Sequence, residues 1–399
     1  MKQQYLIALD QGTTTSRAII FNAAGEIVSQ AQYAFTQHYP HPGWVEHDAE
    51  EIFATQAKAL AKAFAASGLQ ATDIAGIGIT NQRETVVVWD KKTAKPLCNA
   101  IVWQCRRTAE MCDQIDQAGM ADYIATTTGL VLDAYFSATK IQWILDNITG
   151  AAAAAKDGQL RCGTIDSWLI YRLSGGKEHI TDYTNASRTM LFDIHRLAWD
   201  EVLLKEFKIP DHMLPRPVKN NGHLATVATD IKGLEALAGI PILSCIGDQP
   251  SALFGQACFE AGEVKNTYGT GCFTLMNTAE NPVKSTHNLL TSIAWVLDDQ
   301  VTYALEGSVF NAGSAIQWLR DELGIIASAR ECDTLAERVI DNGGVYFVPA
   351  FTGLGAPHWD MYARGTISGL TRGSNKCHLA RATLEAIAYQ IADLQDGIC

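Results

Sequence analysis

The first third of the chain alternates between short apolar runs and polar turns, the pattern of a sheet built from consecutive strands. The connections between the first three runs are short and contain Gly or Asn, which is typical of an antiparallel meander. The predicted strands of this meander span residues 4–9, 17–22 and 26–35. Apolar runs predict further strands at 74–80, 85–89, 242–247, 263–268, 272–276, 301–305 and 345–349.

Between these strands, apolar residues recur at helical spacing. The first predicted helix is capped by Asp48, with Glu51 three residues later as in a capping box, and it ends at Gly68. Its buried face is predicted to consist of Phe53, Ala57, Leu60 and Phe64. Further helices are predicted at 109–118, 139–147, 250–258, 312–322, 329–340 and 376–394.

One local pattern occurs twice. Residues 5–21 form a predicted strand, a turn rich in Gly and Thr, and a second strand, and residues 263–276 repeat this order around Gly269, Thr270 and Gly271. The two hairpins lie about 260 residues apart. The repeat predicts an α/β protein with two similar domains that face each other.

Composition narrows the classes of protein that fit this architecture. The chain has 399 residues, of which 47% are hydrophobic and 19% are charged, as in soluble globular proteins with two or three domains. Its net charge of −12 argues against nucleic-acid binding, because a phosphate backbone requires a basic surface. Apolar runs stay below the roughly 18 residues of a membrane span, and the N-terminus does not resemble a signal peptide, so we expect a cytoplasmic protein.

The spacing of cysteine and histidine gives little indication of a metal site. The ten cysteines include no C-x-x-C pair and none stands at zinc-ligand spacing from a histidine, so we expect small buried side chains. His38, His41 and His47 cluster in the stretch HYPHPGWVEHD. We expect a loop with solvated imidazoles there, because no flanking strand or helix is predicted to fix a ligand geometry; a metal site is the alternative.

The turn of the first hairpin, within LDQGTTTSR, carries groups that suit phosphate. Gly12 allows backbone N–H groups to converge, and the hydroxyls of residues 13–16 add hydrogen-bond donors. Asp10 could hold a Mg²⁺ that bridges phosphates, and Arg17 could neutralise a transferring phosphoryl group. The stretch does not have the Walker A pattern. A polar hairpin turn with a solvated acid is the alternative.

Seven motifs resemble, in order along the chain, those of the glycerol kinases in the FGGY carbohydrate kinase family. They are LDQGTTTSR, ITNQRETVVVWD, NAIVWQCRRTAE, TDYTNASRTMLF, GDQPSALFGQ, NTYGTGCF and PAFTGLGAPHWD. The resemblance implies two ribonuclease-H-like domains of the actin, heat-shock ATPase and sugar kinase superfamily around a cleft. The N-terminal domain would span residues 1–250 and a partial C-terminal domain residues 259–399.

The resemblance further implies ATP-dependent phosphorylation of glycerol to sn-glycerol 3-phosphate, the first step of glycerol catabolism. Asp248 matches the general base, which accepts the proton of the attacking hydroxyl. Arg83 and Glu84 form an adjacent donor and acceptor pair after a strand, which suits two neighbouring hydroxyls. The residues that the family would place around glycerol are Arg83, Glu84, Tyr135, Asp248, Gln249, Trp103 and Phe273.

Each of these residues also has a structural alternative. Arg83 and Glu84 could form a surface ion pair, the three aromatic residues could be core or half-buried side chains, and Asp248 could cap the helix that follows it. For the whole chain, one alternative is another FGGY kinase that acts on a ketose or a sugar acid. The other is a catalytically inactive chain that binds glycerol.

The same resemblance assigns a nucleotide site and a metal. The residues that match nucleotide contacts of the family are Thr13, Thr14, Thr15, Arg17, Thr270, Gly313 and Gln317. Mg²⁺ is implied as the cofactor, with Asp10 as its ligand. The expected partners are glycerol and ATP, and we expect a homo-oligomer, either a dimer or a tetramer.

The chain departs from the family pattern in two places. It ends after the helix at 376–394, before a strand and a Gly-rich loop that contact adenosine in the family, so we expect an incomplete second domain and weak ATP binding. That helix is expected to expose an apolar face, which would promote oligomerisation. The face consists of Leu384, Ile387, Ile391 and Leu394.

The stretch IKGLEALAG has Lys232 but lacks the Arg with which some bacterial relatives bind fructose 1,6-bisphosphate, so inhibition by that ligand is not expected.

Overall fold

The N-terminal hairpin lies at the centre of the larger sheet. In the computed structural model, which describes residues 4–398, buried and partly buried side chains alternate along β1 (Tyr5–Gln11) and β2 (Thr15–Phe21). This alternation places one side of each strand against the core. The two strands pair antiparallel, and β3 (Ile27–Ala34) pairs antiparallel with β2. The predicted meander is therefore confirmed.

The other half of this sheet is parallel. β5 (Ile74–Asn81) pairs parallel with β1, and β14 (Pro241–Gly247) pairs parallel with β5. β13 (Asn221–Thr226) forms the edge, so the strand order is β13-β14-β5-β1-β2-β3. The carboxyl ends of β1, β5 and β14 consequently meet at one end of the sheet, where ligands of α/β proteins commonly bind.

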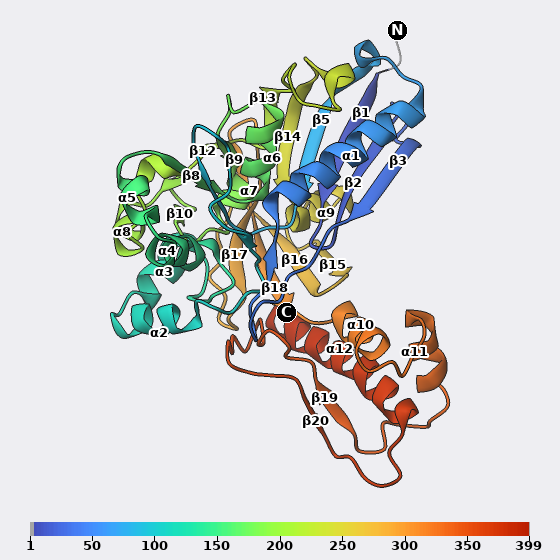
Figure 1. Ribbon diagram of the computed structural model, residues 1–399. Coiled ribbons are helices and arrows are strands. Elements are labelled where there is room, and N and C mark those ends of the chain that lie inside the picture. Colours follow the sequence, from blue (N-terminus) through green and yellow to red (C-terminus); the bar gives the residue numbers. More distant parts are fainter. Residues whose placement is uncertain (1–3, 399) are drawn as a thin grey trace.

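Helix α1 (Ala49–Ser67) packs along β2 and β3 on one face of this sheet (Figure 1). The Asp48 side chain accepts hydrogen bonds from N–H groups of the first turn, and a left-handed glycine ends the helix, as predicted. The Glu51 carboxylate, predicted to complete a capping box, instead accepts a hydrogen bond from Thr36 Oγ1 at 3.1 Å. Of the predicted inner face, Ala57 is only partly buried and the other three residues are buried.

The second predicted hairpin starts a smaller sheet. β15 (Val264–Tyr268) and β16 (Cys272–Ala279) pair antiparallel, as predicted. β18 (Gln300–Val309) and β17 (Leu290–Leu297) continue the sheet in the order β15-β16-β18-β17. No strand is predicted at β17, because its first seven residues are all buried and give no alternation of polar and apolar positions.

The segment between the two sheets contains short elements that the sequence pattern predicts only in part. Its helices are α2 (Ala109–Gln117), α3 (Ala121–Thr128), α4 (Ser137–Asn147), α5 (Ala151–Lys156), α6 (Ile165–Leu173), α7 (Tyr183–Ala186), α8 (Glu201–Glu206) and α9 (Asp248–Gly255). Small two-stranded pairs are β4 (Glu46–His47) with β7 (Ala100–Ile101), β6 (Val87–Asp90) with β8 (Leu160–Gly163), β9 (Ile180–Asp182) with β12 (Arg216–Val218), and β10 (Phe192–Asp193) with β11 (Ala198–Trp199). The predicted helices at 109–118, 139–147 and 250–258 correspond to α2, α4 and α9.

The C-terminal part of the chain forms a lobe of helices. α10 (Gly313–Asp321) and α11 (Ala329–Ala336) pack against α12 (Lys376–Ile398), and β19 (Tyr346–Val348) pairs with β20 (Thr366–Ser368) beside α12 (Figure 1). All three helices match predicted ones, and α11 is shorter than expected.

The apolar face of α12 is covered, contrary to the expectation. Ile391 and Leu394 are buried in a cluster with residues of β16 and β18, and Ile387 packs against the same cluster. Leu384 packs against the cluster formed with α10 and α11. The smaller sheet and helices α10 and α11 therefore cover the face of α12 that is predicted to be exposed. This face no longer supports the prediction of a homo-oligomer.

One hydrophobic cluster joins the smaller sheet to the N-terminal domain. Phe273 and Leu275 of β16 belong to the same buried cluster as Val86, Trp103 and Phe136 from the first 250 residues. The second sheet therefore packs directly on the N-terminal domain, and both contribute walls to the space between them.

His47 contradicts the expectation of solvated imidazoles. It is fully buried on β4, its Nε2 lies 2.7 Å from Gln37 Oε1, and its ring packs edge-on against Phe35. Burial lowers the pKa of His47 to about 3. Within the described residues, the three histidines of this stretch do not belong to a group with metal-ligand spacing.

The cysteines follow the prediction where they are described. Of the nine in residues 4–398, seven are buried and all are free thiols, whereas Cys399 lies outside the described residues. None of the helices within residues 4–398 combines the length and the apolar composition of a membrane-spanning helix.

Candidate active site

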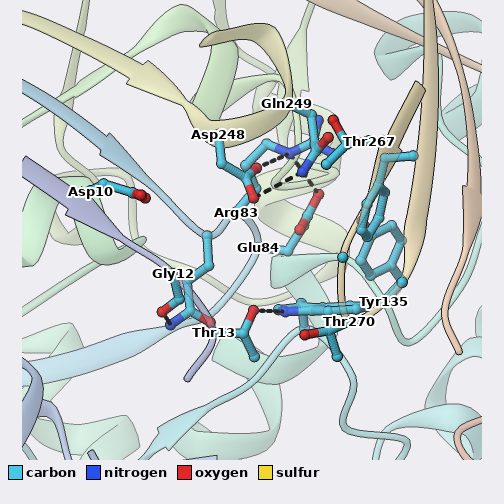
Figure 2. Close-up of a pocket in the computed structure, with 15 residues that line it drawn as sticks. Asp10, Gly12, Thr13, Arg83, Glu84, Tyr135, Asp248, Gln249, Thr267 and Thr270 are labelled. Carbon is cyan, nitrogen blue, oxygen red and sulfur yellow. Dashed lines mark hydrogen bonds and ion pairs between the residues drawn. The ribbon is translucent and has the colours of Figure 1, made fainter. Parts of the chain in front are cut away.

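A cavity of about 330 Å³ lies where the two hairpin turns approach the carboxyl ends of β5 and β14 (Figure 2). Fifteen residues line it. Ten of them are predicted site residues: Asp10, Thr13, Arg83, Glu84, Trp103, Tyr135, Asp248, Gln249, Thr270 and Phe273. The others are Gln82, Thr267 and three turn glycines. The fold therefore gathers in one place residues that are up to about 260 positions apart in the sequence.

The two hairpin turns face the cavity with threonines. Gly12 N–H donates to the Thr15 carbonyl at 2.9 Å, which closes the first turn, and Gly269 N–H donates to the Gly271 carbonyl at 2.9 Å in the second. A Cβ on Gly271 would lie 2.4 Å from the Val309 carbonyl, so this turn requires glycine. Thr13 and Thr270 line the cavity from the two turns.

Three predicted phosphate residues lie outside the cavity lining. Thr14 is exposed and Thr15 begins β2, where its backbone carbonyl closes the turn. Arg17, also on β2, does not line the cavity either, and its guanidinium donates to Asp10 Oδ2 at 2.6 Å. The first turn therefore presents Thr13 and the Asp10 carboxylate to the cavity.

Arg83 and Glu84, directly after β5, are buried rather than paired on the surface. Only 2% of the Arg83 residue and 1% of the Glu84 residue are accessible. Glu84 has a positive φ of 59°, a strained conformation for this residue that turns the chain at the cavity wall. The Arg83 guanidinium donates two hydrogen bonds to Glu306 at 2.6 and 2.7 Å, and its Nε lies 3.3 Å from Asp248 Oδ1.

A second buried arginine completes this network. Arg188 Nε donates to Glu84 Oε1 at 2.6 Å, and Arg188 Nη2 lies 3.3 Å from Glu306 Oε1. Burial raises the pKa of Glu306, but Arg188 and Arg83 outweigh this effect and hold it at about 2. Burial leaves the pKa of Glu84 above its usual value despite the two arginines.

Arg188 and Glu306 belong to the network beside the cavity and are not among the predicted site residues. Arg188 lies in the quoted string TDYTNASRTMLF, without a chemical role, and Glu306 is a lone acid within the buried strand β18. A charged residue within an otherwise apolar strand segment is the signal that could have found Glu306, because a buried charge requires a partner.

Asp248 lies at the start of α9 without capping it. Gly247 is the N-cap of this helix, and no side chain within the described residues bonds to its free N–H groups. The Asp248 side chain keeps 34% of its surface accessible, towards the cavity, and Gln249 Nε2 donates to its Oδ2 at 3.0 Å. Burial raises the pKa of Asp248, while Arg83 lowers it in part. The helix-cap alternative is therefore wrong for this carboxylate.

An aromatic wall forms the opposite side of the cavity. The Trp103 ring packs edge-on against Tyr135 and Phe273, at centroid distances of 5.7 and 5.8 Å. Trp103 Nε1 donates to Thr13 Oγ1 at 3.1 Å, which ties the wall to the first turn (Figure 2). All three rings are more than 90% buried and still line the cavity, so they act as walls as well as core.

Lys140 holds the backbone that carries Tyr135. Its buried ammonium group donates to the carbonyls of Ala134, Tyr135 and Phe136 at 2.5, 2.6 and 2.9 Å. Burial lowers the pKa of Lys140 to about 7. Because an ammonium group has three donors, the three carbonyls satisfy it fully and fix this segment at the cavity.

Gly313 and Gln317 lie beside the second turn. The N–H groups of Gly313 and Ser314 donate to the carbonyls of Gly269 and Thr270 at 3.0 and 3.1 Å, so the start of α10 rests on this turn. Gln317, one turn further along α10, lines a second cavity of about 320 Å³. Other residues of this second cavity are Tyr39, Gln104, Asn311, Ser314, Phe351 and Thr352.

Comparison with known families decides the assignment of the fold. Residues 5–255 match the N-terminal domain of the FGGY family of carbohydrate kinases, and residues 264–399 match its C-terminal domain. This chain belongs to the FGGY family of carbohydrate kinases. The two hairpins around the cavity thus belong to the two domains of an FGGY kinase, with the fold of the actin and heat-shock ATPase superfamily.

Relatives and solved structures agree with this assignment. This FGGY kinase is 56% identical to a glycerol kinase of Petrotoga mobilis and 58% identical to one of Pseudothermotoga lettingae, over 99% of its length and 79% and 78% of theirs. The structure of Plasmodium falciparum glycerol kinase with ADP superposes with a TM-score of 0.84 at 38% identity, covering 99% of this chain and 78% of that one. A xylulose kinase from Lactobacillus acidophilus has the same fold, with a TM-score of 0.83 at 22% identity and coverage of 99% and 78%.

Proposed function

We propose that this FGGY kinase transfers the γ-phosphoryl group of ATP to glycerol and releases sn-glycerol 3-phosphate and ADP. The observation that carries the proposal is the small cavity between the two turns, in which a donor and acceptor pair and the partly exposed Asp248 carboxylate face an aromatic wall. A three-carbon polyol offers hydroxyl groups on one side and a short carbon chain on the other, and both sides of this cavity match it. The relatives at 56–58% identity are glycerol kinases, which supports the same substrate.

In this mechanism Arg83 and Glu84 orient the substrate. Arg83 donates to one hydroxyl and Glu84 accepts from its neighbour, while Trp103 and Phe273 contact the carbon side and exclude water. Asp248 accepts the proton of the attacking primary hydroxyl as its oxygen bonds to the γ-phosphorus. The bond from that phosphorus to the β,γ-bridging oxygen breaks, and ADP leaves with this oxygen.

We further propose that the nucleotide extends from the two turns into the second cavity. Thr13 and Thr270 donate hydrogen bonds to the phosphates, and Gln317 lies beside the sugar and base. Two buried polar atoms of the second cavity, Asn311 Nδ2 and Thr352 Oγ1, have no hydrogen-bond partner within residues 4–398. A nucleoside would supply partners for both atoms, which supports this placement.

Mg²⁺ is the cofactor that we propose for this site. Asp10 fits the group, because its carboxylate lines the cavity next to the phosphate turn and Mg²⁺ binds through one or two carboxylates together with phosphates. Its Oδ2 accepts a hydrogen bond from Arg17, which leaves Oδ1 as the oxygen available to a metal. When bound, Mg²⁺ supplies charge neutralisation at the phosphates.

The first experiment measures ATP- and Mg²⁺-dependent formation of glycerol 3-phosphate by the 399-residue chain. Asp248→Asn should lower kcat by at least about a hundredfold, because it removes the proton acceptor. Asp211→Asn, at a side chain that is 85% exposed, is the matched control and should leave kcat unchanged. An Asp248→Asn variant with full activity would contradict the assigned base.

A substrate panel separates this proposal from its alternatives. Xylulose, ribulose and gluconate are offered beside glycerol, and a higher kcat/KM for one of them would replace glycerol as the substrate. Calorimetry with glycerol is run on the same preparation. Binding of glycerol without turnover would identify a chain that binds the polyol but does not phosphorylate it.

A further inference from the structure

We propose that Lys265 of the second domain is a positioning residue that holds the Gln249 amide in one orientation, with its NH₂ group towards Asp248 and the cavity. The inference rests on the proposed function, because it assigns a direction to the hydrogen bond that Gln249 makes with the substrate. Lys265 lies on β15 and Gln249 on α9, so the contact joins the two FGGY domains.

The contacts of Lys265 determine which end of the amide faces it. Its ammonium group donates to Gln249 Oε1 at 2.5 Å, to Thr267 Oγ1 at 2.9 Å and to the Phe273 carbonyl at 3.2 Å. An ammonium group donates three hydrogen bonds and accepts none, so the atom of Gln249 that faces it must be the carbonyl oxygen. The opposite end of the amide, the NH₂ group, then points to Asp248 Oδ2 at 3.0 Å.

This orientation fixes the polarity of the substrate contacts. An amide NH₂ has two N–H groups, and Asp248 takes one of them. Gln249 lines the cavity, so its second N–H is available to a substrate hydroxyl oxygen. With the amide reversed, its carbonyl would face the carboxylate of Asp248, and two acceptors would repel each other. Lys265 therefore makes Gln249 a donor to the substrate and leaves Asp248 as the acceptor.

The surroundings of Lys265 explain why it keeps this position. It is 5% exposed, lies on β15 and pairs with Leu275 of β16. Its charged neighbours are Glu306 and Asp248, which favour the ammonium form, and Arg83, which opposes it. Burial lowers the pKa of Lys265 to about 8, so the group is charged below that pH.

A purely structural role, in which Lys265 only ties β15 to β16, predicts different kinetics. A double-mutant cycle of Lys265→Met and Gln249→Leu distinguishes the two roles, because both substitutions remove the polar end of the side chain and keep an apolar part of it. kcat and KM for glycerol are measured for the four proteins. Each single variant should lower kcat/KM about tenfold to a hundredfold, the effect of losing a hydrogen bond with a charged group.

The double variant decides between the roles. If Lys265 acts through Gln249, Lys265→Met has little further effect in the Gln249→Leu background. If the two effects multiply, the proposal is wrong. Lys265→Arg keeps a donor-only side chain and should recover part of the activity that Lys265→Met loses. Lys205→Met, at an exposed position of α8, is the matched control and should behave as the parent chain.

The outcome for the parent chain separates this inference from the proposed function. Should it bind glycerol without turnover, the same cycle is run on glycerol affinity by calorimetry, with the same expectations. Should it neither bind nor phosphorylate glycerol, the proposed function fails, and with it the assigned role of Lys265. A cycle on the midpoint of urea unfolding then still reports whether the Lys265–Gln249 contact exists.

Discussion

Glu306 is the residue on which the buried charges of the site depend. Its carboxylate binds both Arg83 and Arg188, and Arg188 in turn binds Glu84, so four charges of alternating sign form one network. All four side chains are almost completely buried, and a buried charge without a partner is costly. Glu306 therefore fixes the terminal nitrogens of the Arg83 guanidinium, while the Arg83 Nε faces Asp248 and the cavity.

Glu306→Gln should disrupt this network. The amide keeps the shape of the side chain but removes the negative charge that two arginines share, so the free energy of unfolding should fall by about 3–5 kcal/mol. Urea unfolding measures the effect, and KM for glycerol should rise in the folded variant because Arg83 is less fixed. Glu337→Gln, at an exposed position after α11, should change stability by less than about 0.5 kcal/mol. A similar small change for both variants would contradict the role of Glu306.

His47 gives the chain a sensitivity to acid. Its Nε2–H donates to Gln37 Oε1, and its Nδ1 is buried without a partner within the described residues, so a second proton has no acceptor. The folded pKa of about 3 lies below the unfolded value of 6.5. Between these values the unfolded state binds more protons, so the stability from the neutral ring is fully present above pH 6.5 and is lost as the pH falls towards 3.

The slope of stability against pH tests this effect. His47→Gln should reduce the loss of unfolding free energy between pH 6.5 and 4 by about 1 kcal/mol per pH unit, as measured by urea unfolding at several pH values. His179, which burial also shifts to a pKa of about 4, leaves part of the slope in place. The exposed His223 is the control, and His223→Gln should keep the slope of the parent chain.

At the scale of elements, the contact between α10 and the second turn brings together the residues of the proposed nucleotide site. A Cβ on Gly313 would lie 2.5 Å from the Gly269 carbonyl, so the helix can approach the turn only with glycine at this position. The approach places Ser314 and Gln317 along the second cavity, directly beyond Thr270. A displacement of α10 would therefore separate the two parts of the proposed ATP site.

Gly313→Ala should push the helix away from the turn. We expect a loss of about 1–3 kcal/mol in unfolding free energy from the steric clash, together with weaker ADP binding in calorimetry. Gly255→Ala, in α9, meets no atom within 4 Å and should be neutral or stabilise the chain by up to about 1 kcal/mol. Unchanged ADP affinity in Gly313→Ala would remove α10 from the nucleotide site.

Local patterns predicted the hairpins and most long helices, because alternation and capping are properties of neighbouring residues. Strand β17 was not predicted, because it is buried on both faces and therefore shows no alternation of polar and apolar positions. The buried ion-pair network was not predicted for a different reason, because its members are far apart in the sequence. Arg83 and Glu306 are separated by 223 positions, and Arg188 and Glu84 by 104. The motifs identified the residues that face the cavity, whereas the residues that hold them require the fold.

At the scale of the whole molecule, the two FGGY domains share the proposed substrate site. Arg83, Glu84 and Asp248 come from the first domain, and Phe273 and Glu306 from the second. One hydrophobic cluster contains residues of both domains. The proposed phosphate contacts are divided in the same way between the two turns. The contacts between the two domains therefore also assemble the proposed site.

The network across β18 also couples the two halves of this chain. Glu306 of one half binds Arg83 and Arg188 of the other, so a change of charge on one side leaves a buried charge on the other side without its partner. A substitution on one side of the network constrains which residues the other side can accept.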